Sequence, residues 1–95
     1  MNVVHELKSW PSFFRPIVDG CRMHELRRND RYFNVGDQLI LREYEPECKI
    51  YTGSTCLVEV SSITSKDTPC AVSESALDPD FCILSIKLIS RTEVN

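Results

Sequence analysis

The sequence predicts a small α+β domain: a mixed β-barrel or curled sheet of about five strands, capped by one or two short helices. The chain has 95 residues, enough for one hydrophobic core but not for a second independent unit. Short segments with alternating apolar and polar residues recur along it, and one early segment has helical spacing instead. We therefore expect a single domain over residues 1–95. A closed or nearly closed barrel would also remove the exposed strand edges.

The first part of the chain predicts a strand followed by the helix. Residues 3–8 alternate as a short strand. Ser9 is placed as the N-cap of the helix, Pro11 falls in its first turn, and Gly20 is a natural stop. Pro16 lies inside the helix and predicts a kink or two short helical pieces. The apolar positions at helical spacing, for which a place in the core is the first expectation, are Trp10, Phe13, Phe14, Ile17 and Val18.

Extended segments follow from residue 21 onward. Residues 23–29 alternate so that Glu25 and Arg27 share one face, and Arg28 falls on the other. The clearest strand is 38–45. The remaining segments are a turn-rich link at 29–37 that packs through Tyr32, Phe33 and Val35, a loop or hairpin at 45–53, a strand at 55–64, a polar excursion at 65–80 and a last strand at 81–90.

Composition predicts an ordinary folded protein in the cytoplasm. The hydrophobic fraction is 42% and the charged fraction 26%, and neither a signal peptide nor a membrane span is apparent. The five cysteines are odd in number, and no C-x-x-C occurs. Because the two histidines also lack zinc-finger spacing, we expect reduced thiols, no metal site and no cofactor.

Charge is distributed unevenly along the chain. Residues 1–42 carry a formal charge of +2 and residues 43–95 a charge of −5, within a total of −3. A uniformly basic, polyanion-binding domain is therefore not indicated. A local basic cleft on an acidic body is compatible with this pattern.

One short motif carries a family resemblance. Gly20-x-Arg22-x-x-Glu25-x-Arg27 resembles the G-x-K-x-x-E-x-R signature of ASCH domains, which are PUA-like β-barrels. The chain resembles the DUF3850 group within them more closely, through a series of short sequence segments between residues 5 and 53. These segments are His5-Glu6-Leu7-Lys8, Arg28-Asn29-Asp30-Arg31, Phe33, Val35-Gly36-Asp37, Leu39, Leu41, Arg42-Glu43-Tyr44 and Tyr51-Thr52-Gly53.

The resemblance implies a PUA-like fold that binds RNA or a modified nucleotide in a cleft beside the helix and the motif strand. Arginine is suited to phosphate, and a neighbouring carboxylate can orient it or accept a hydrogen bond from a base amino group. Trp10, Tyr44 or Tyr51 would offer a stacking face. The candidate ligand-binding residues are Lys8, Trp10, Arg22, Glu25, Arg27, Arg28 and Tyr44.

The motif also departs from the family pattern. Some ASCH proteins are amidohydrolases that use the motif lysine together with a threonine and a glutamate. Here Arg22 stands at the lysine position and Glu25 at the threonine position. A guanidinium stays protonated and cannot act as a base, so we do not expect that activity. Lys8 and Glu25 remain the only acid-base candidates.

Alternatives to RNA binding stay open. A hydrolase acting on RNA or a modified nucleoside is one of them. Another is a protein-interaction module, phage-borne or regulatory, that uses the acidic stretch with Glu43, Glu45 and Glu47. Glu25 and Arg27 could be an internal ion pair rather than ligand contacts. Arg28 flanks a turn and could be a solvated charge.

Overall fold

The computed structural model describes residues 2–94 as one five-stranded sheet and two short helices. The elements in chain order are β1 (Val4–Ser9), α1 (Pro11–Val18), β2 (His24–Arg28), β3 (Gln38–Glu45), β4 (Ile50–Thr64), α2 (Ser73–Ala76) and β5 (Phe81–Thr92). Neither helix within this part of the chain is long and apolar enough to cross a membrane.

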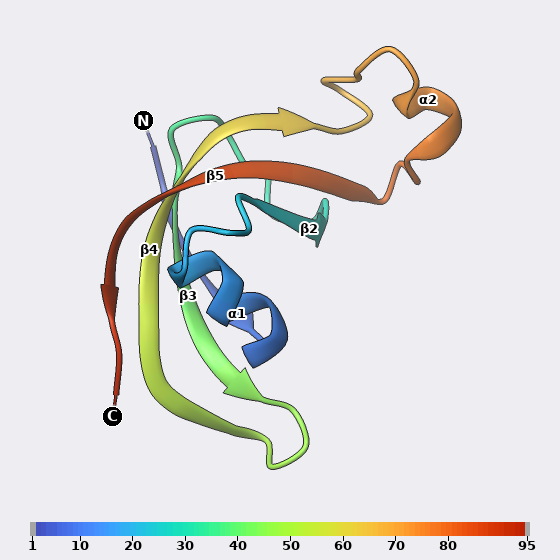
Figure 1. Ribbon diagram of the computed structural model, residues 1–95. Coiled ribbons are helices and arrows are strands. Elements are labelled where there is room, and N and C mark those ends of the chain that lie inside the picture. The colour runs from blue at the N-terminus through green and yellow to red at the C-terminus, as the bar shows by residue number, and fades with distance from the viewer. Residues whose placement is uncertain (1, 95) are drawn as a thin grey trace.

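The sheet is mixed and strongly curved. Its strand order is β1-β3-β4-β5-β2, with β1 parallel to β3 and all other pairs antiparallel. It curls around α1 as a half-barrel (Figure 1). The predicted α+β class and curled sheet are confirmed. The expected barrel closure is not complete, because β1 and β2 stand at the two ends of the strand order.

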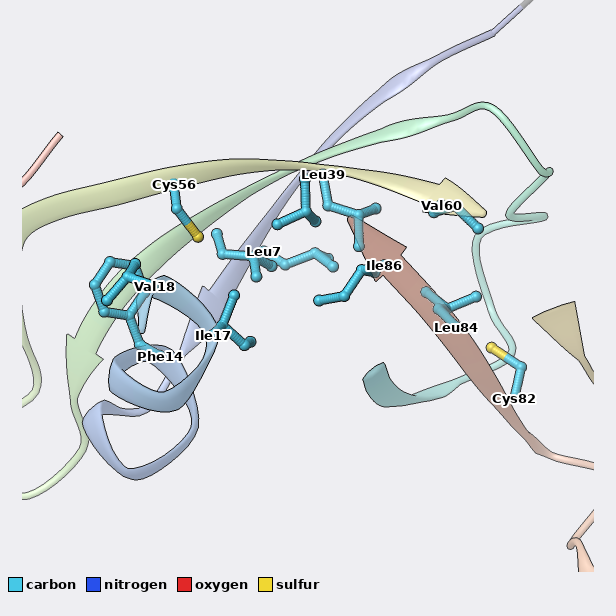
Figure 2. Packing of buried hydrophobic residues seen from close by; sticks show 12 residues of the cluster. Leu7, Phe14, Ile17, Val18, Leu39, Cys56, Val60, Cys82, Leu84 and Ile86 are labelled. Carbon is cyan, nitrogen blue, oxygen red and sulfur yellow. The ribbon is translucent and has the colours of Figure 1, made fainter. Parts of the chain in front are cut away.

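The core lies between the concave face of the sheet and α1 (Figure 2). Alternate positions of β1, β3, β4 and β5 point inward, as period-two strands require. Burying each large apolar side chain contributes about 1.5–3 kcal/mol. The buried set is Leu7, Phe14, Ile17, Val18, Leu39, Leu41, Cys56, Val58, Val60, Cys82, Leu84 and Ile86.

Helix α1 begins differently from the sequence prediction but stops at Gly20 as predicted. Ser9 is still in β1, paired with Glu43, so Trp10 takes the N-cap position without a side-chain cap. The expected Ser9 cap is wrong because only one residue separates strand and helix. The helix is a single segment despite Pro16, and it ends two residues later. Gly20, at φ +79°, closes it through backbone bonds from Gly20 and Cys21 to the carbonyls of the last turn.

The β3–β4 hairpin is tighter than predicted. β4 begins at Ile50, which pairs with Glu45, so the turn occupies only residues 46–49. Lys49 provides the left-handed residue of this turn, at φ +57°. The sequence prediction treated Gly53 as part of a loop, whereas Gly53, at φ +96°, lies inside β4 beside an irregular stretch of the ladder.

The 29–37 link packs through fewer side chains than predicted. Phe33 packs against the core, but Tyr32 is 91% exposed and Val35 is 57% exposed. The buried Asp37 carboxylate orders this segment instead, accepting bonds from the backbone N–H of Asn34 and of Val3. It also accepts a bond from His5 Nε2 at 2.9 Å.

Candidate functional site

A cleft of about 480 Å³ opens between the β1–α1 junction and strand β2. Its lining contains the motif residues predicted from the sequence. The lining residues are Lys8, Ser9, Trp10, Phe13, Arg22, Glu25, Leu26 and Arg27. Two guanidinium groups and one carboxylate therefore face this space, which gives a locally positive lining on a chain whose net charge is −3. Lys8 also lines the cleft, but its amine lies 4.4 Å from the Tyr44 ring centroid.

Glu25 and Arg27 form a close ion pair in the cleft. Glu25 is 4% exposed, and Arg27 Nε donates to its Oε2 at 2.8 Å. The same guanidinium donates from Nη2 to the Lys8 carbonyl oxygen at 2.6 Å. Within residues 2–94, no hydrogen bond reaches Glu25 Oε1. Arg27 therefore neutralises a buried carboxylate, and one oxygen of that carboxylate remains available to a ligand.

Arginine side chains also bridge the two ends of the half-barrel. Arg27, on β2, bonds the Lys8 carbonyl of β1, and Arg31 Nη1 donates to the Glu6 carbonyl at 3.2 Å. These carbonyls lie on an end strand of the sheet order. Side chains thus supply bonds at an edge where a closed barrel would use backbone pairing.

Trp10 and Phe13 form an exposed aromatic pair at the mouth of the cleft. Their ring centroids are 6.2 Å apart with an interplanar angle of 24°, and Trp10 is 50% and Phe13 41% exposed. Their expected place in the core is wrong, because α1 turns Phe14, Ile17 and Val18 inward instead. Arg22, following the Gly20 turn, has its Cζ atom 4.8 Å from the Phe13 ring centroid.

Two polar atoms of the cleft residues are buried without hydrogen-bond partners, Ser9 Oγ and Arg22 Nε. Ser9 itself is only 3% exposed. An unsatisfied buried donor or acceptor costs about 1–3 kcal/mol, so a bound group or a water that reached either atom would stabilise the cleft. Sequence reasoning missed Ser9 because it assigned the hydroxyl to helix capping.

Two of the predicted site residues lie outside the cleft lining. Arg28 is exposed, and its Cζ atom is 5.1 Å from the Phe81 ring centroid. Tyr44 lies on β3 with its ring 4.4 Å from Lys8 Nζ. The five that line the cleft are Lys8, Trp10, Arg22, Glu25 and Arg27.

The acidic hairpin face is smaller than the sequence predicted. Glu43 is 2% exposed and accepts both Arg15 Nε and Arg15 Nη2 at 3.0 Å. It is therefore not part of a solvated acidic surface. Glu45 and Glu47 remain on the hairpin outside the core.

The buried thiols are poorly suited to nucleophilic chemistry. Burial, with a smaller contribution from the charge of Glu25, raises the pKa of Cys56 to about 12. Burial also raises the pKa of Cys82. Both thiols stay protonated at neutral pH, and the thiolate is the reactive form. No group of three or more metal-ligating side chains occurs within residues 2–94.

A larger cleft, about 560 Å³, lies between the 29–35 link and residues 63–68. The buried polar side chain there is already satisfied: Ser65 Oγ is 3.1 Å from Thr68 Oγ1 and accepts the Asp67 N–H. The smaller cleft is the better candidate site, because only its lining combines unpaired buried polar atoms with a buried ion pair.

A curled five-stranded half-barrel with a cationic, aromatic cleft beside its helix defines the class of this protein. The chain matches the family described as "Domain of unknown function (DUF3850)" over residues 4–86 and belongs to that family. It is also 30% identical over 64 residues to the "Uncharacterized 12.9 kDa protein in GpA 3'region" of Escherichia phage P2. That alignment covers 67% of this chain and 57% of the phage protein, so the chain spans little more than half of its relative.

Proposed function

We propose that this half-barrel binds a nucleotide unit, either of single-stranded RNA or of a modified nucleotide, in the cleft between α1 and β2. The same proposal treats the fold as PUA-like and of the ASCH type, on the strength of the Gly20-x-Arg22-x-x-Glu25-x-Arg27 motif. The observation that carries it is the combination in one cleft of an exposed aromatic pair, a locally positive lining and unpaired buried polar atoms.

Each feature matches one part of a nucleotide. A base stacks on the exposed Trp10 ring, which contributes about 1–3 kcal/mol for a base–aromatic contact. Arg22 attracts the phosphate, and a charge-assisted hydrogen bond contributes about 1.5–3 kcal/mol. The free Oε1 of Glu25 accepts a hydrogen bond from a base amino group or a ribose hydroxyl.

The cleft favours ligand binding over ligand hydrolysis. The motif position holds an arginine, and a guanidinium group cannot serve as a base or amine nucleophile. Lys8 holds its amine over the Tyr44 ring, on the outer face of the sheet. A hydrolase reading has no base at the motif position, and no contact in residues 2–94 favours it over binding.

The test uses the intrinsic fluorescence of Trp10, the single tryptophan of the chain. We expect mononucleotides and short single-stranded RNA to quench this fluorescence, and we expect salt to weaken binding. Arg22→Ala is the informative variant, because Arg22 forms no ion pair within residues 2–94 and its loss should leave the fold intact. Lys66→Ala removes an exposed cation outside the cleft lining and is the matched control.

The expected result is at least tenfold weaker binding for Arg22→Ala and unchanged binding for Lys66→Ala. A tenfold change corresponds to about 1.4 kcal/mol, the lower range of one charge-assisted hydrogen bond. A folded wild-type protein whose fluorescence responds to no RNA or nucleotide, at low salt, would overturn the proposal.

A further inference from the structure

Two tyrosines flanked by two cations form a row on the outer face of the sheet, starting at the cleft. Lys8 Nζ is 4.4 Å from the Tyr44 ring centroid, and the Tyr44 and Tyr51 centroids are 5.1 Å apart. Arg42 Cζ is 3.8 Å from the Tyr51 centroid. We call these four residues, Lys8, Tyr44, Tyr51 and Arg42, the cation–tyrosine row.

Strand alternation places the row on the face opposite the core. On β3, Leu41 and Glu43 are buried on the inner face, so Arg42 and Tyr44 project outward. Lys8 is the register partner of Arg42 in the parallel β1–β3 pair and projects to the same side. Three of the four residues therefore share the outer face because of their strand positions alone.

An irregularity in the β3–β4 ladder places the fourth residue, Tyr51, on the same face. Arg42 pairs with Thr55 and Tyr44 pairs with Tyr51, so two steps along β3 correspond to four along β4. In a regular ladder Gly53 would stand opposite Tyr44. The irregularity is fixed by internal bonds, since Thr52 Oγ1 donates to Glu43 and accepts the Ser54 N–H. The effect is to place an aromatic ring, rather than a glycine, beside Tyr44.

The row is accessible and joins the proposed nucleotide cleft. Tyr51 is 40% exposed, and the Arg42 side chain is 38% exposed. Lys8 belongs to both features, because it lines the cleft and stands over Tyr44. Arg42 also pairs with Glu6 at 2.9 Å, but the Glu6 side chain is 58% exposed, and exposed pairs of this kind are readily replaced by a phosphate.

We propose that the cation–tyrosine row continues the binding path of the cleft, so that the ligand is a single-stranded RNA segment rather than a lone nucleotide. This rests on the proposed function of the cleft. One base occupies the cleft, the backbone passes Lys8, and a following base stacks on Tyr51 beside Tyr44, with a phosphate at Arg42. From β1 to β4 the path spans two strand spacings, about 10 Å, so occupying both features takes a chain of nucleotides.

Aromatic rings flanked by cations suit an unpaired strand in particular. Unpaired bases expose their faces to stacking, whereas bases in a duplex are already stacked.

The experiment separates the row from the cleft by ligand length. Full-length protein is titrated with uridine monophosphate and with labelled oligouridylates of up to about eight nucleotides, within the range of known single-strand sites. Trp10 fluorescence reports occupancy of the cleft, and anisotropy reports binding of the whole oligonucleotide. The variants are Tyr51→Ala, Tyr51→Phe and Arg42→Ala. Tyr32→Ala is the matched control, because Tyr32 is 91% exposed and lies outside both the cleft lining and the row.

We expect affinity to increase with length in the wild type. Tyr51→Ala should weaken oligonucleotide binding roughly 5- to 150-fold, the size of one lost base–aromatic stack, and leave uridine monophosphate binding unchanged. Tyr51→Phe keeps the ring and should retain wild-type binding. Arg42→Ala should lower the slope of log affinity against log salt by about 0.7, as expected for one lost phosphate contact to a single strand.

Different outcomes overturn the two proposals. Trp10 quenching with an affinity that depends neither on length nor on Tyr51 would overturn the row and leave the cleft standing. Equal affinity for a matched RNA duplex would also overturn the row. The absence of any Trp10 response to mononucleotides and oligonucleotides alike would instead overturn the cleft, on which the row depends.

Discussion

The buried pair of Arg15 and Glu43 gives the sharpest prediction about stability. Arg15 reaches from α1 to β3 and meets both carboxylate oxygens of Glu43 at 3.0 Å, and Thr52 Oγ1 donates to Oε1 at 2.7 Å. Glu43 is 2% exposed, whereas the Arg15 side chain is 48% exposed. Arg15→Ala therefore leaves a buried carboxylate with the Thr52 hydroxyl as its remaining donor within residues 2–94.

The magnitude follows from that geometry. Breaking a fully buried pair by removing one partner costs about 3–5 kcal/mol. Because Arg15 is half exposed, water can reach the vacated position, and we expect a loss of about 2–3 kcal/mol. For a domain of this size, whose total stability is about 5–14 kcal/mol, such a loss lowers Tm by roughly 10–20 °C.

Urea and thermal unfolding of matched variants test the reasoning. Arg15→Lys keeps the charge but loses the two-pronged contact, so its stability should fall between wild type and Arg15→Ala. Arg15→Ala/Glu43→Leu removes the buried charge with its partner and should recover most of the loss. A Tm within about 2 °C of wild type for Arg15→Ala, or a double variant no more stable than the single one, would refute the argument.

Three further predictions concern single positions. Ser9→Ala should keep or raise stability, because Ser9 Oγ has no partner within residues 2–94, and should weaken nucleotide binding roughly three- to tenfold; a loss of Tm would contradict this. Lys49→Gly should raise the free energy of unfolding by up to about 1 kcal/mol, seen as a higher urea midpoint, because Lys49 sits at φ +57°. An unchanged or lower midpoint would argue against strain there. Burial tends to raise the pKa of Asp37, but hydrogen bonds from His5, Val3 and Asn34 outweigh it, so the folded pKa lies below 3.8. The stability that the Asp37 carboxylate contributes is therefore present above pH 3.8 and is lost as pH falls below it. In Asp37→Asn the urea midpoint should fall less steeply at acid pH than in the wild type, and an equal fall in the two proteins would contradict this.

Strand alternation explains why much of the sheet was predictable. Residues 38–45 alternate cleanly between buried and partly exposed positions, and β3 occupies the predicted range. The start of β4 was not predictable in the same way. Gly53 is a turn signal in a local reading, and only the ladder with β3 shows that it lies inside a strand. Lys49 gave no signal of a turn, because a lysine rarely adopts positive φ.

The cleft was predictable where it depends on spacing and unpredictable where it depends on packing. Glu25 and Arg27 are two apart on a strand, so a shared face follows from the sequence, and Arg28 falls on the opposite face for the same reason. The exposure of Trp10 was not foreseeable, since helical spacing fixes the neighbours of an aromatic residue but not how much of the sheet reaches it. The row beside the cleft depends on a ladder irregularity that no local pattern encodes.

Arg27 has a structural role in the fold and also lines the cleft. It neutralises the buried Glu25 and holds β2 to the Lys8 carbonyl of β1. Removing it would leave an uncompensated buried charge, so lost binding in an Arg27 variant would not distinguish a ligand contact from a disturbed fold. Arg22 has a buried Nε without a partner and no ion pair within residues 2–94. Substitution of Arg22 therefore reports more directly on the ligand than substitution of Arg27 does.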